Sequence, residues 1–148
     1  MPAGGIGSRT PGARGIIRGR QGILRTMQTI LVVDDEPLIR WAVREGLESA
    51  GYAVLEAGTA REALALLSSG AAPVAVALLD VRLPDSDDLG LLRRVRREAP
   101  GCRVIIMTAH GTPELLAEAM SAGAFGTIFK PFDMARIVGL VRAAGGAA

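Results

Sequence analysis

The chain is poor in the residues that cross-link a small protein or bind soft metals. Among its 148 residues there is one cysteine, Cys102, and one histidine, His110. A single thiol excludes an intramolecular disulfide framework and is typical of a reducing compartment. We therefore expect a cytoplasmic protein without a cysteine and histidine zinc site.

Long apolar runs are also missing. Hydrophobic residues make up 49% of the chain, yet no uncharged apolar run approaches the roughly 18 residues that cross a bilayer. Gly and Arg interrupt the N-terminal segment, which lacks the continuous apolar stretch of a secretory signal. These absences predict no membrane insertion.

The first 26 residues contain no acidic side chain. They hold five arginines, whereas the remaining residues carry 12 basic and 15 acidic side chains, a net charge of −3. The first segment is rich in Gly, Pro and Arg and has no periodicity, which predicts disorder. We expect a disordered basic leader at 1–26, one domain at 27–144 and a frayed end at 145–148. A nucleic-acid-binding tail is the alternative for the leader, and a dispensable leader is the interpretation we favour.

Apolar runs of strand length alternate with helical patterns, five of each, in the rest of the chain. This alternation predicts a parallel sheet with helical crossovers. Four of the runs are followed directly by residues with chemical capacity, namely Asp34 and Asp35, Asp80, Thr108 and Lys130. Because all strands of a parallel sheet end at the same edge, we expect these side chains to meet there. A lone acid pair at a strand end usually caps the next helix, but residues matched across four strand ends favour a site.

Three carboxylates without His or Cys are ligands for a hard cation, Mg²⁺ or Mn²⁺. Asp80 is the candidate nucleophile, since a carboxylate can accept a phosphoryl group. Lys130 would neutralise one phosphoryl oxygen and the Thr108 hydroxyl would donate to another. The bond from Lys130 to Pro131 is a candidate cis peptide that would aim the lysine inward.

The set Asp34-Asp35, Asp80, Thr108 and Lys130-Pro131-Phe132 resembles the receiver domain of bacterial two-component response regulators, over residues 28–144. Residues 80–86 and 107–111 resemble receivers of sigma-54-dependent, NtrC-type regulators. The resemblance implies a flavodoxin-like, doubly wound parallel sheet of five strands in the order 2-1-3-4-5 with helices on both faces. It also implies that Asp80 is phosphorylated, and that Asp35, Asp80 and the backbone carbonyl of Arg82 hold the metal, with Asp34 acting through water.

Partners are also implied by the resemblance. A sensor histidine kinase or histidine phosphotransfer protein would supply the phosphoryl group, and an unknown downstream protein would read it. We expect no direct nucleic-acid contact, a monomer or weak phosphorylation-dependent dimer, and no catalysis beyond the chain's own phosphorylation and dephosphorylation. Docking in the family maps onto two apolar groups, which are Leu38, Ile39, Ala42 and Gly46 in the first helix and Pro131 and Phe132 after the last strand.

The sequence departs from the family at two positions. Thr127 stands where the family usually has Tyr or Phe, three residues before the lysine. Phe125 and Phe129 flank it, and we expect both in the core. Asp88 stands where the family often has Gly, which predicts a different loop shape after Asp80.

Four functions compete. The leading hypothesis is a stand-alone phosphoacceptor without an output domain, and the second is a piece of a sigma-54-type transcription regulator. A phosphatase of the haloacid dehalogenase type needs Asp-x-Asp at the nucleophile, whereas Arg82 stands two residues after Asp80. A non-phosphorylated binding module is disfavoured by the complete set of site residues.

Overall fold

The structure, a computed structural model, describes residues 16–18, 24–70, 72–86 and 88–146. Five parallel strands form one sheet in the order β4-β3-β5-β6-β7. This is the predicted order, with β3 as the first strand of the domain. The strands are β3 (Thr29–Val33), β4 (Ala53–Ala57), β5 (Val74–Asp80), β6 (Arg103–Thr108) and β7 (Gly126–Phe129). The helices are α1 (Pro37–Ser49), α2 (Ala60–Ser68), α3 (Gly90–Glu98), α4 (Pro113–Ser121) and α5 (Met134–Ala144).

Local signals in the sequence start the helices. The Thr59 hydroxyl accepts a hydrogen bond from the Glu62 amide at 3.0 Å and caps α2. Thr112 caps α4 in the same way, with Pro113 in the first turn. Each cap satisfies an amide that the helix itself leaves without a partner, and Pro suits the first turn because its missing donor is not needed there.

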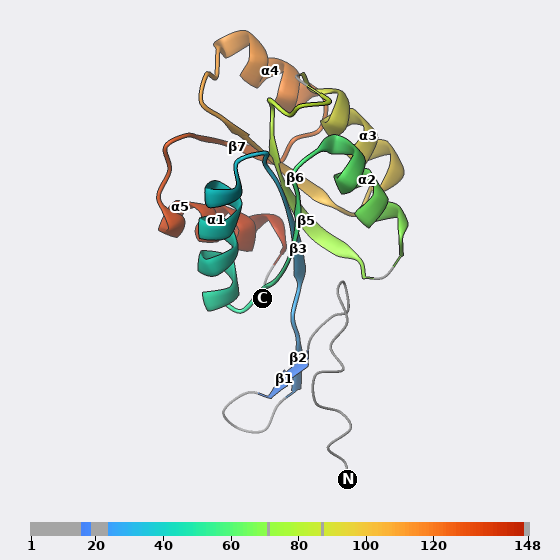
Figure 1. The fold of residues 1–148 in the computed structure, drawn as a ribbon, viewed down its shortest axis with the longest axis vertical. Coiled ribbons are helices and arrows are strands. Elements are labelled where there is room, and N and C mark those ends of the chain that lie inside the picture. Colours follow the sequence, from blue (N-terminus) through green and yellow to red (C-terminus); the bar gives the residue numbers. More distant parts are fainter. Residues whose placement is uncertain (1–15, 19–23, 71, 87, 147–148) are drawn as a thin grey trace.

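Each face of the sheet has its own apolar core. Helices α1 and α5 cover one face, and α2, α3 and α4 cover the other (Figure 1). Successive residues of β3 alternate between the two cores: Ile30 and Val32 face α1 and α5, and Leu31 and Val33 face α2 and α3. All four are fully buried. Because the strands are apolar on both sides, the sheet is stabilised from both faces, by about 1.5–3 kcal/mol for each large side chain.

The sequence pattern predicts two apolar rows on α1, but only one of them packs on the sheet. The rows are Ile39, Val43, Leu47 and Ala50, and beside them Leu38, Ala42 and Gly46. Val43 and Leu47 are buried, and Ile39 and Ala50 pack beside them. Leu38, on the other row, is 80% exposed. The core row was correctly predicted, and the second row is left on the surface at its N-terminal end.

Two short strands lie inside the segment that was predicted to be disordered. Strand β1 (Ile16–Arg18) pairs antiparallel with β2 (Leu24–Thr26). The expectation of disorder therefore does not hold for these six residues, because their backbones pair with each other. The rest of the predicted leader, and residues 147–148 of the predicted frayed end, lie outside the described residues.

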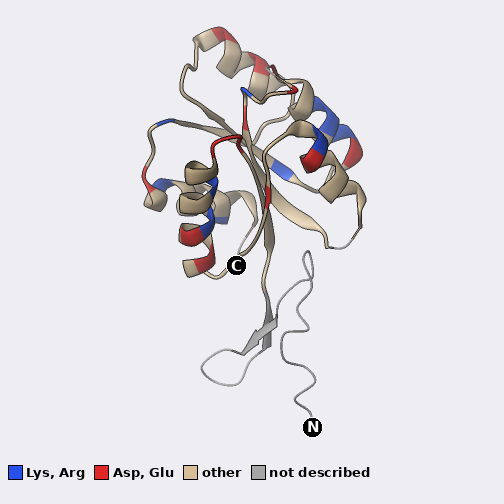
Figure 2. Ribbon diagram, in the orientation of Figure 1, with Lys and Arg blue, Asp and Glu red and all other residues tan. Residues whose placement is uncertain are grey.

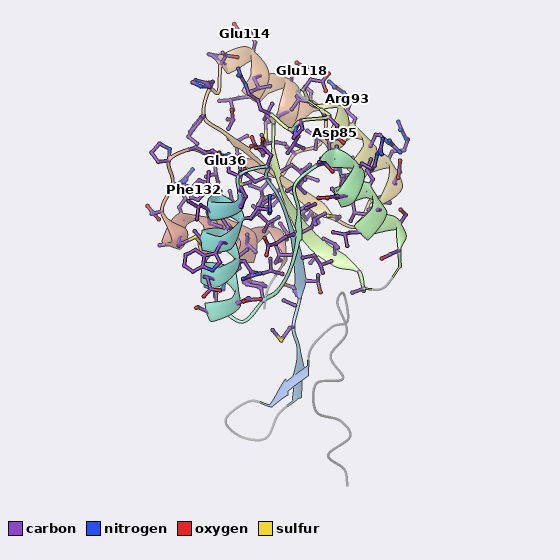
Figure 3. The ribbon with its side chains drawn as sticks, viewed as in Figure 1. Glu36, Asp85, Arg93, Glu114, Glu118 and Phe132 are labelled. Atoms are coloured by element: carbon purple, nitrogen blue, oxygen red, sulfur yellow. The ribbon has the colours of Figure 1, made fainter. Side chains whose placement is uncertain are left out.

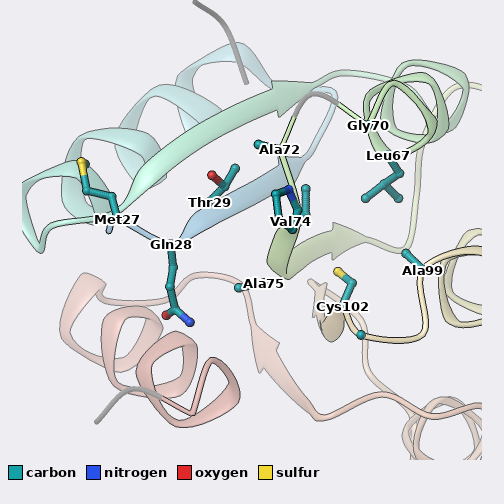
Figure 4. Close-up of a pocket in the computed structure, with 12 residues that line it drawn as sticks. Met27, Gln28, Thr29, Leu67, Gly70, Ala72, Val74, Ala75, Ala99 and Cys102 are labelled. Atoms are coloured by element: carbon teal, nitrogen blue, oxygen red, sulfur yellow. The ribbon is translucent and has the colours of Figure 1, made fainter. Parts of the chain in front are cut away.

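The sheet has a hollow at the edge where β3 and β5 begin (Figure 4). This amino edge cavity has a volume of about 710 Å³, and its lining is mainly apolar, with Val74, Leu67 and Cys102 among the side chains. Among the described residues, no helix is long and apolar enough to cross a membrane.

Candidate phosphoryl and metal site

Asp34 follows β3 and is the most deeply buried acid of the site, with no exposed surface. Its two carboxylate oxygens have separate partners. Oδ1 accepts a hydrogen bond from the Glu36 amide at 2.9 Å, and Oδ2 lies 2.7 Å from the Lys130 ammonium. Burial of a carboxylate is costly unless it is paired and hydrogen-bonded, and these partners fix Asp34 in one orientation.

Asp80 is the last residue of β5, and its side chain is 9% exposed. Oδ1 accepts from the Arg82 amide at 3.1 Å, and Oδ2 accepts from Lys130 at 3.1 Å. Burial raises the pKa of Asp80 above its usual value; the hydrogen bonds from Arg82 and Lys130 oppose this effect, and the nearby charge of Asp34 adds to it. The Asp80 carboxylate is thus held in place by two donors, while burial and the charge of Asp34 disfavour its charged form.

Lys130 joins the two acids from the end of β7. Its ammonium lies between Asp34 and Asp80. Glu36, labelled beside the start of α1 in Figure 3, has its Oε1 3.6 Å from this ammonium. Burial lowers the pKa of Lys130, but its hydrogen bonds to Asp34 and Asp80 outweigh that effect, so the pKa is raised. The bond from Lys130 to Pro131 is cis, as predicted.

Thr108 ends β6 beside these groups and is 5% exposed. Its Oγ1 accepts a hydrogen bond from the His110 amide at 3.1 Å, which holds the loop after β6 close to the strand. A cavity of about 240 Å³ opens here, lined by Asp35, Glu36, Asp80, Arg82, Thr108, Ala109, His110 and Lys130. Five of these were predicted from the sequence as site residues: Asp35, Asp80, Arg82, Thr108 and Lys130.

The acids fit a divalent cation. Carboxylate oxygens of Asp34, Asp35 and Asp80 lie within 4.8 Å of one another. Lys130 compensates only one of these three negative charges, so the cluster still attracts a hard cation. The Asp35 side chain is exposed. The Arg82 backbone lies beside the cluster, because its amide donates to Asp80. The roles predicted for the Arg82 carbonyl and for Asp34 through water stay predictions.

The sequence of residues 30–142 matches the profile of the response regulator receiver domain. The chain belongs to the response regulator receiver family. A curated relative, the DNA-binding transcriptional regulator NtrC of Salmonella typhimurium, is 38% identical over 115 residues, which are 78% of this chain but only 24% of the relative. The chain thus spans about a quarter of the length of the curated relatives it matches.

Solved receivers share the fold. A CheY-like receiver protein from Methanospirillum hungatei has a TM-score of 0.76 and 30% identity, covering 81% of this chain and 94% of that structure. The beryllofluoride-activated receiver dimer of NtrC4 has a TM-score of 0.76 and 32% identity, covering 81% of this chain and 98% of that one.

The receiver's aromatic residues lie differently from our expectation. Phe125 and Phe129 were predicted in the core, but they are 38% and 46% exposed. Both lie at ends of β7, where the strand leaves the cover of the helices. The ring of Phe129 lies so close to Gly111 that a Cβ there would overlap it. Thr127 is half-buried in the middle of β7, and its aromatic neighbours Phe125 and Phe129 are on the surface.

The loop after Asp80 is held at both ends. Asp85 accepts hydrogen bonds from the amides of Ala60 and Arg61, at 2.8 and 3.0 Å, and these contacts lower its pKa. Asp88 accepts from the Gly90 amide at 2.7 Å, at the start of α3. Asp88, one residue before the N-cap Leu89, thus provides an acceptor for the first amide of α3.

The predicted docking residues are only partly on the surface. Leu38, Ala42 and Pro131 are exposed, whereas Ile39 and Phe132 pack beside the α1–α5 core. Gly46 faces the Met134 side chain of α5 so closely that a Cβ would overlap it. The exposed members, with Trp41 at 55% exposure, remain the candidates for docking.

The arginines of α3 form the exposed, basic outer side of that helix (Figure 2). Arg93 pairs with Glu118 of α4 at 2.7 Å, and Arg94 with Glu98 at 2.8 Å. Exposed arginines that pair with neighbouring acids are typical of a solvated helix face. Such exposed pairs contribute little to stability.

Sequence reasoning missed two members of the site. Glu36 was not among the predicted site residues, yet it lines the cavity and its Oε1 lies 3.6 Å from the Lys130 ammonium. Arg40 was not singled out, although its guanidinium contacts the backbone of Asp34. The sequence did carry a signal for Arg40: it follows Glu36 by one helical turn, so the two side chains lie on the same side of α1.

Proposed function

We propose that Asp80 is the phosphoacceptor of this receiver and that a phosphohistidine of a kinase or phosphotransfer protein is the donor. One carboxylate oxygen of Asp80 attacks phosphorus, the bond from phosphorus to the histidine nitrogen breaks, and that nitrogen keeps the electron pair and takes up a proton. The observation that carries the proposal is the contact of Asp80 with Lys130 in a cavity of about 240 Å³ lined by Thr108.

Each neighbouring group has a part in that reaction. Lys130 neutralises charge on the transferred group, and Thr108 offers a hydroxyl donor. Asp34, Asp35 and Asp80 would hold Mg²⁺ or Mn²⁺, which when bound neutralises further charge. The chain would then act only on its own phosphorylation and dephosphorylation, without turning over another substrate.

The rest of the proposal concerns partners. A cytoplasmic location belongs to it, since the phosphoryl donor would be met there. The phosphorylated receiver would act as a monomer or as a weak dimer toward an unknown downstream protein. The activated NtrC4 receiver is named as a dimer, which supports the second state for this chain.

Two settings compete for this receiver. The stand-alone regulator was our first hypothesis, and the relatives named as NtrC transcriptional regulators favour the other, a receiver that serves an NtrC-type regulator. The intact mass of the protein isolated from its source organism separates them. A mass near 15.4 kDa supports the stand-alone form, and a much larger mass supports the NtrC-type setting.

Incubation with acetyl phosphate and Mg²⁺ followed by intact mass measurement tests the phosphoacceptor. We expect a gain of one phosphoryl group, which a chelator and Asp80→Ala each abolish. Asp85→Ala is the matched control, since Asp85 does not line this cavity and its carboxylate accepts from the Ala60 and Arg61 amides at the start of α2. A gain that persists in Asp80→Ala, or none in the unmodified protein, would overturn the proposal.

A further inference from the structure

We propose that Arg40 is a positioning residue for the metal site, and that Glu56 holds Arg40 in place. The inference rests on the proposed cation site and adds a residue that touches neither the cation nor the phosphoryl group. Its basis is a set of contacts that link α1 to the edge strand β4 and to the backbone of Asp34.

The contacts of Arg40 are specific. Nη1 donates to the backbone carbonyl of Asp34 at 2.6 Å, and Nε donates to Glu56 Oε1 at 3.2 Å. The side chain is 21% exposed, so most of it is packed. A guanidinium with two fixed acceptors has a defined orientation, unlike a solvated surface arginine.

The surrounding backbone leaves room for the guanidinium. A Cβ at Gly58 would lie 3.1 Å from Nη1 of Arg40. Gly58 follows β4, and its amide donates to Glu62 at 2.7 Å, so the loop itself is held. Arg40 therefore lies where the loops after β3 and β4 approach each other.

This geometry matters for Asp35. The carbonyl that Arg40 holds belongs to the peptide that links Asp34 to Asp35, so the contact fixes the direction in which the chain enters Asp35. Asp35 is exposed, and its carboxylate contributes to the acidic cluster. A ligand whose backbone is already oriented loses less freedom when a cation binds, which strengthens binding.

A second physical effect acts in the opposite direction. Arg40 carries a positive charge close to the acids, and charge alone would weaken the binding of a cation. Removal of Arg40 therefore gives opposite results for the two roles: weaker cation binding if it positions Asp35, and tighter binding if it only contributes charge.

Arg44 is a matched control on the same helix. It lies one turn further along α1 and donates to the other oxygen of Glu56 at 2.6 Å. Within the described part of the chain its ion pairs are with Glu45, Glu48 and Glu56, and it makes no hydrogen bond to Asp34. Arg44→Gln thus removes the same charge and the same type of ion pair without releasing the Asp34 carbonyl.

The test is the affinity of the unphosphorylated protein for Mg²⁺, measured by calorimetry for the unmodified chain, Arg40→Gln, Arg40→Lys and Arg44→Gln. We expect Arg40→Gln to weaken binding about tenfold, a typical loss for a group that supports a metal ligand. Arg40→Lys keeps the charge but loses the planar guanidinium that donates to two acceptors. Its affinity for Mg²⁺ should lie between those of the unmodified chain and Arg40→Gln. Arg44→Gln should leave the affinity unchanged.

Phosphorylation by acetyl phosphate gives a second readout. At saturating Mg²⁺ the maximum rate of Arg40→Gln should equal that of the unmodified protein, with only the Mg²⁺ requirement raised. Tighter binding in Arg40→Gln, or equal losses in Arg40→Gln and Arg44→Gln, would overturn the role of Arg40 alone. Absence of Mg²⁺ binding in the unmodified protein would overturn the cation site itself and this inference with it.

Discussion

The two edges of the sheet are made from the same strands but differ in chemistry. At the carboxyl edge, Asp34, Asp80 and Lys130 form a charged cluster with contacts of 2.7 and 3.1 Å. At the amino edge, the strands begin around an apolar cavity that includes Cys102 and Val74. Between the edges the residues of the central strands β3, β5 and β6 are mostly buried and apolar.

The difference follows from where polar groups can be solvated or paired. Within the strands both faces are covered by helices, so a charge there would be desolvated without a partner. Beyond the last ladder pair the loops supply backbone amides, such as that of Arg82, and other strand ends supply charges. A site can therefore be built at an edge, and in this receiver the carboxyl edge gathers the acidic cluster and its lysine.

Replacement of Lys130 at the carboxyl edge should have the largest effect on stability. Lys130→Met leaves Asp34 and Asp80 without their shared partner, and we expect the free energy of unfolding in EDTA to fall by about 3–5 kcal/mol. Mg²⁺ should restore part of the loss, because a cation that binds only the native protein stabilises it by mass action. Urea unfolding with and without Mg²⁺ measures both.

The control for this prediction is Arg142→Met, an exposed position in α5. It should change the unfolding free energy by less than about 0.5 kcal/mol. A loss in Lys130→Met as small as that of an exposed ion pair, about 1 kcal/mol or less, would contradict the buried charge cluster.

The amino edge should respond to ionisation of its buried thiol, because the charge of Arg96 offsets only part of the effect of burial on the pKa of Cys102. Burial raises the pKa of the Cys102 thiol from 9.0 to about 11. The unfolded chain then loses this proton at lower pH than the native protein, so stability should fall as pH rises from 9 to 11, by up to about 2–3 kcal/mol.

Urea unfolding at several pH values measures that slope, and Cys102→Ala is the comparison. The substitution changes the absolute stability but removes the contribution of the thiol to the slope. Identical slopes in the two proteins would show that the thiol does not ionise with a raised pKa.

Packing at the carboxyl edge can be tested at the contact between Gly111 and Phe129. A Cβ at Gly111 overlaps the Phe129 ring, and the ring is exposed enough to move aside. We expect Gly111→Ala to lower the unfolding free energy by about 1 kcal/mol. In a Phe129→Ala background the same change should have little effect, and full additivity of the two substitutions would exclude the contact.

The smallest expected effect concerns a helix cap at the same edge. Thr59→Ala removes the acceptor for the Glu62 amide and should lower the unfolding free energy by about 1 kcal/mol or less, because Asp85 still binds the amides of Ala60 and Arg61. Thr112→Ala removes the equivalent cap of α4 and serves as the comparison. A larger loss for Thr59→Ala than for Thr112→Ala would contradict this support from Asp85.

Much of the fold could be predicted from local patterns. The alternation of apolar runs with helical patterns predicted the five parallel strands, and the helix starts at Thr59 and at Thr112-Pro113 carry local cap signals in the sequence. These signals are local because hydrophobic period and caps depend on residues within one or two turns. The family resemblance added the strand order, which the structure confirms.

The sequence by itself determined which residues end the strands, and therefore which chemical groups reach the carboxyl edge. Only the tertiary structure decided how they pair: Lys130 contacts Asp34 and Asp80 across 96 and 50 residues of sequence. It also decided that Phe125 and Phe129 are exposed and that Arg40 holds the Asp34 carbonyl. The physical reason is that such contacts depend on strand register and on the space left by neighbouring elements, which no local pattern of residues specifies.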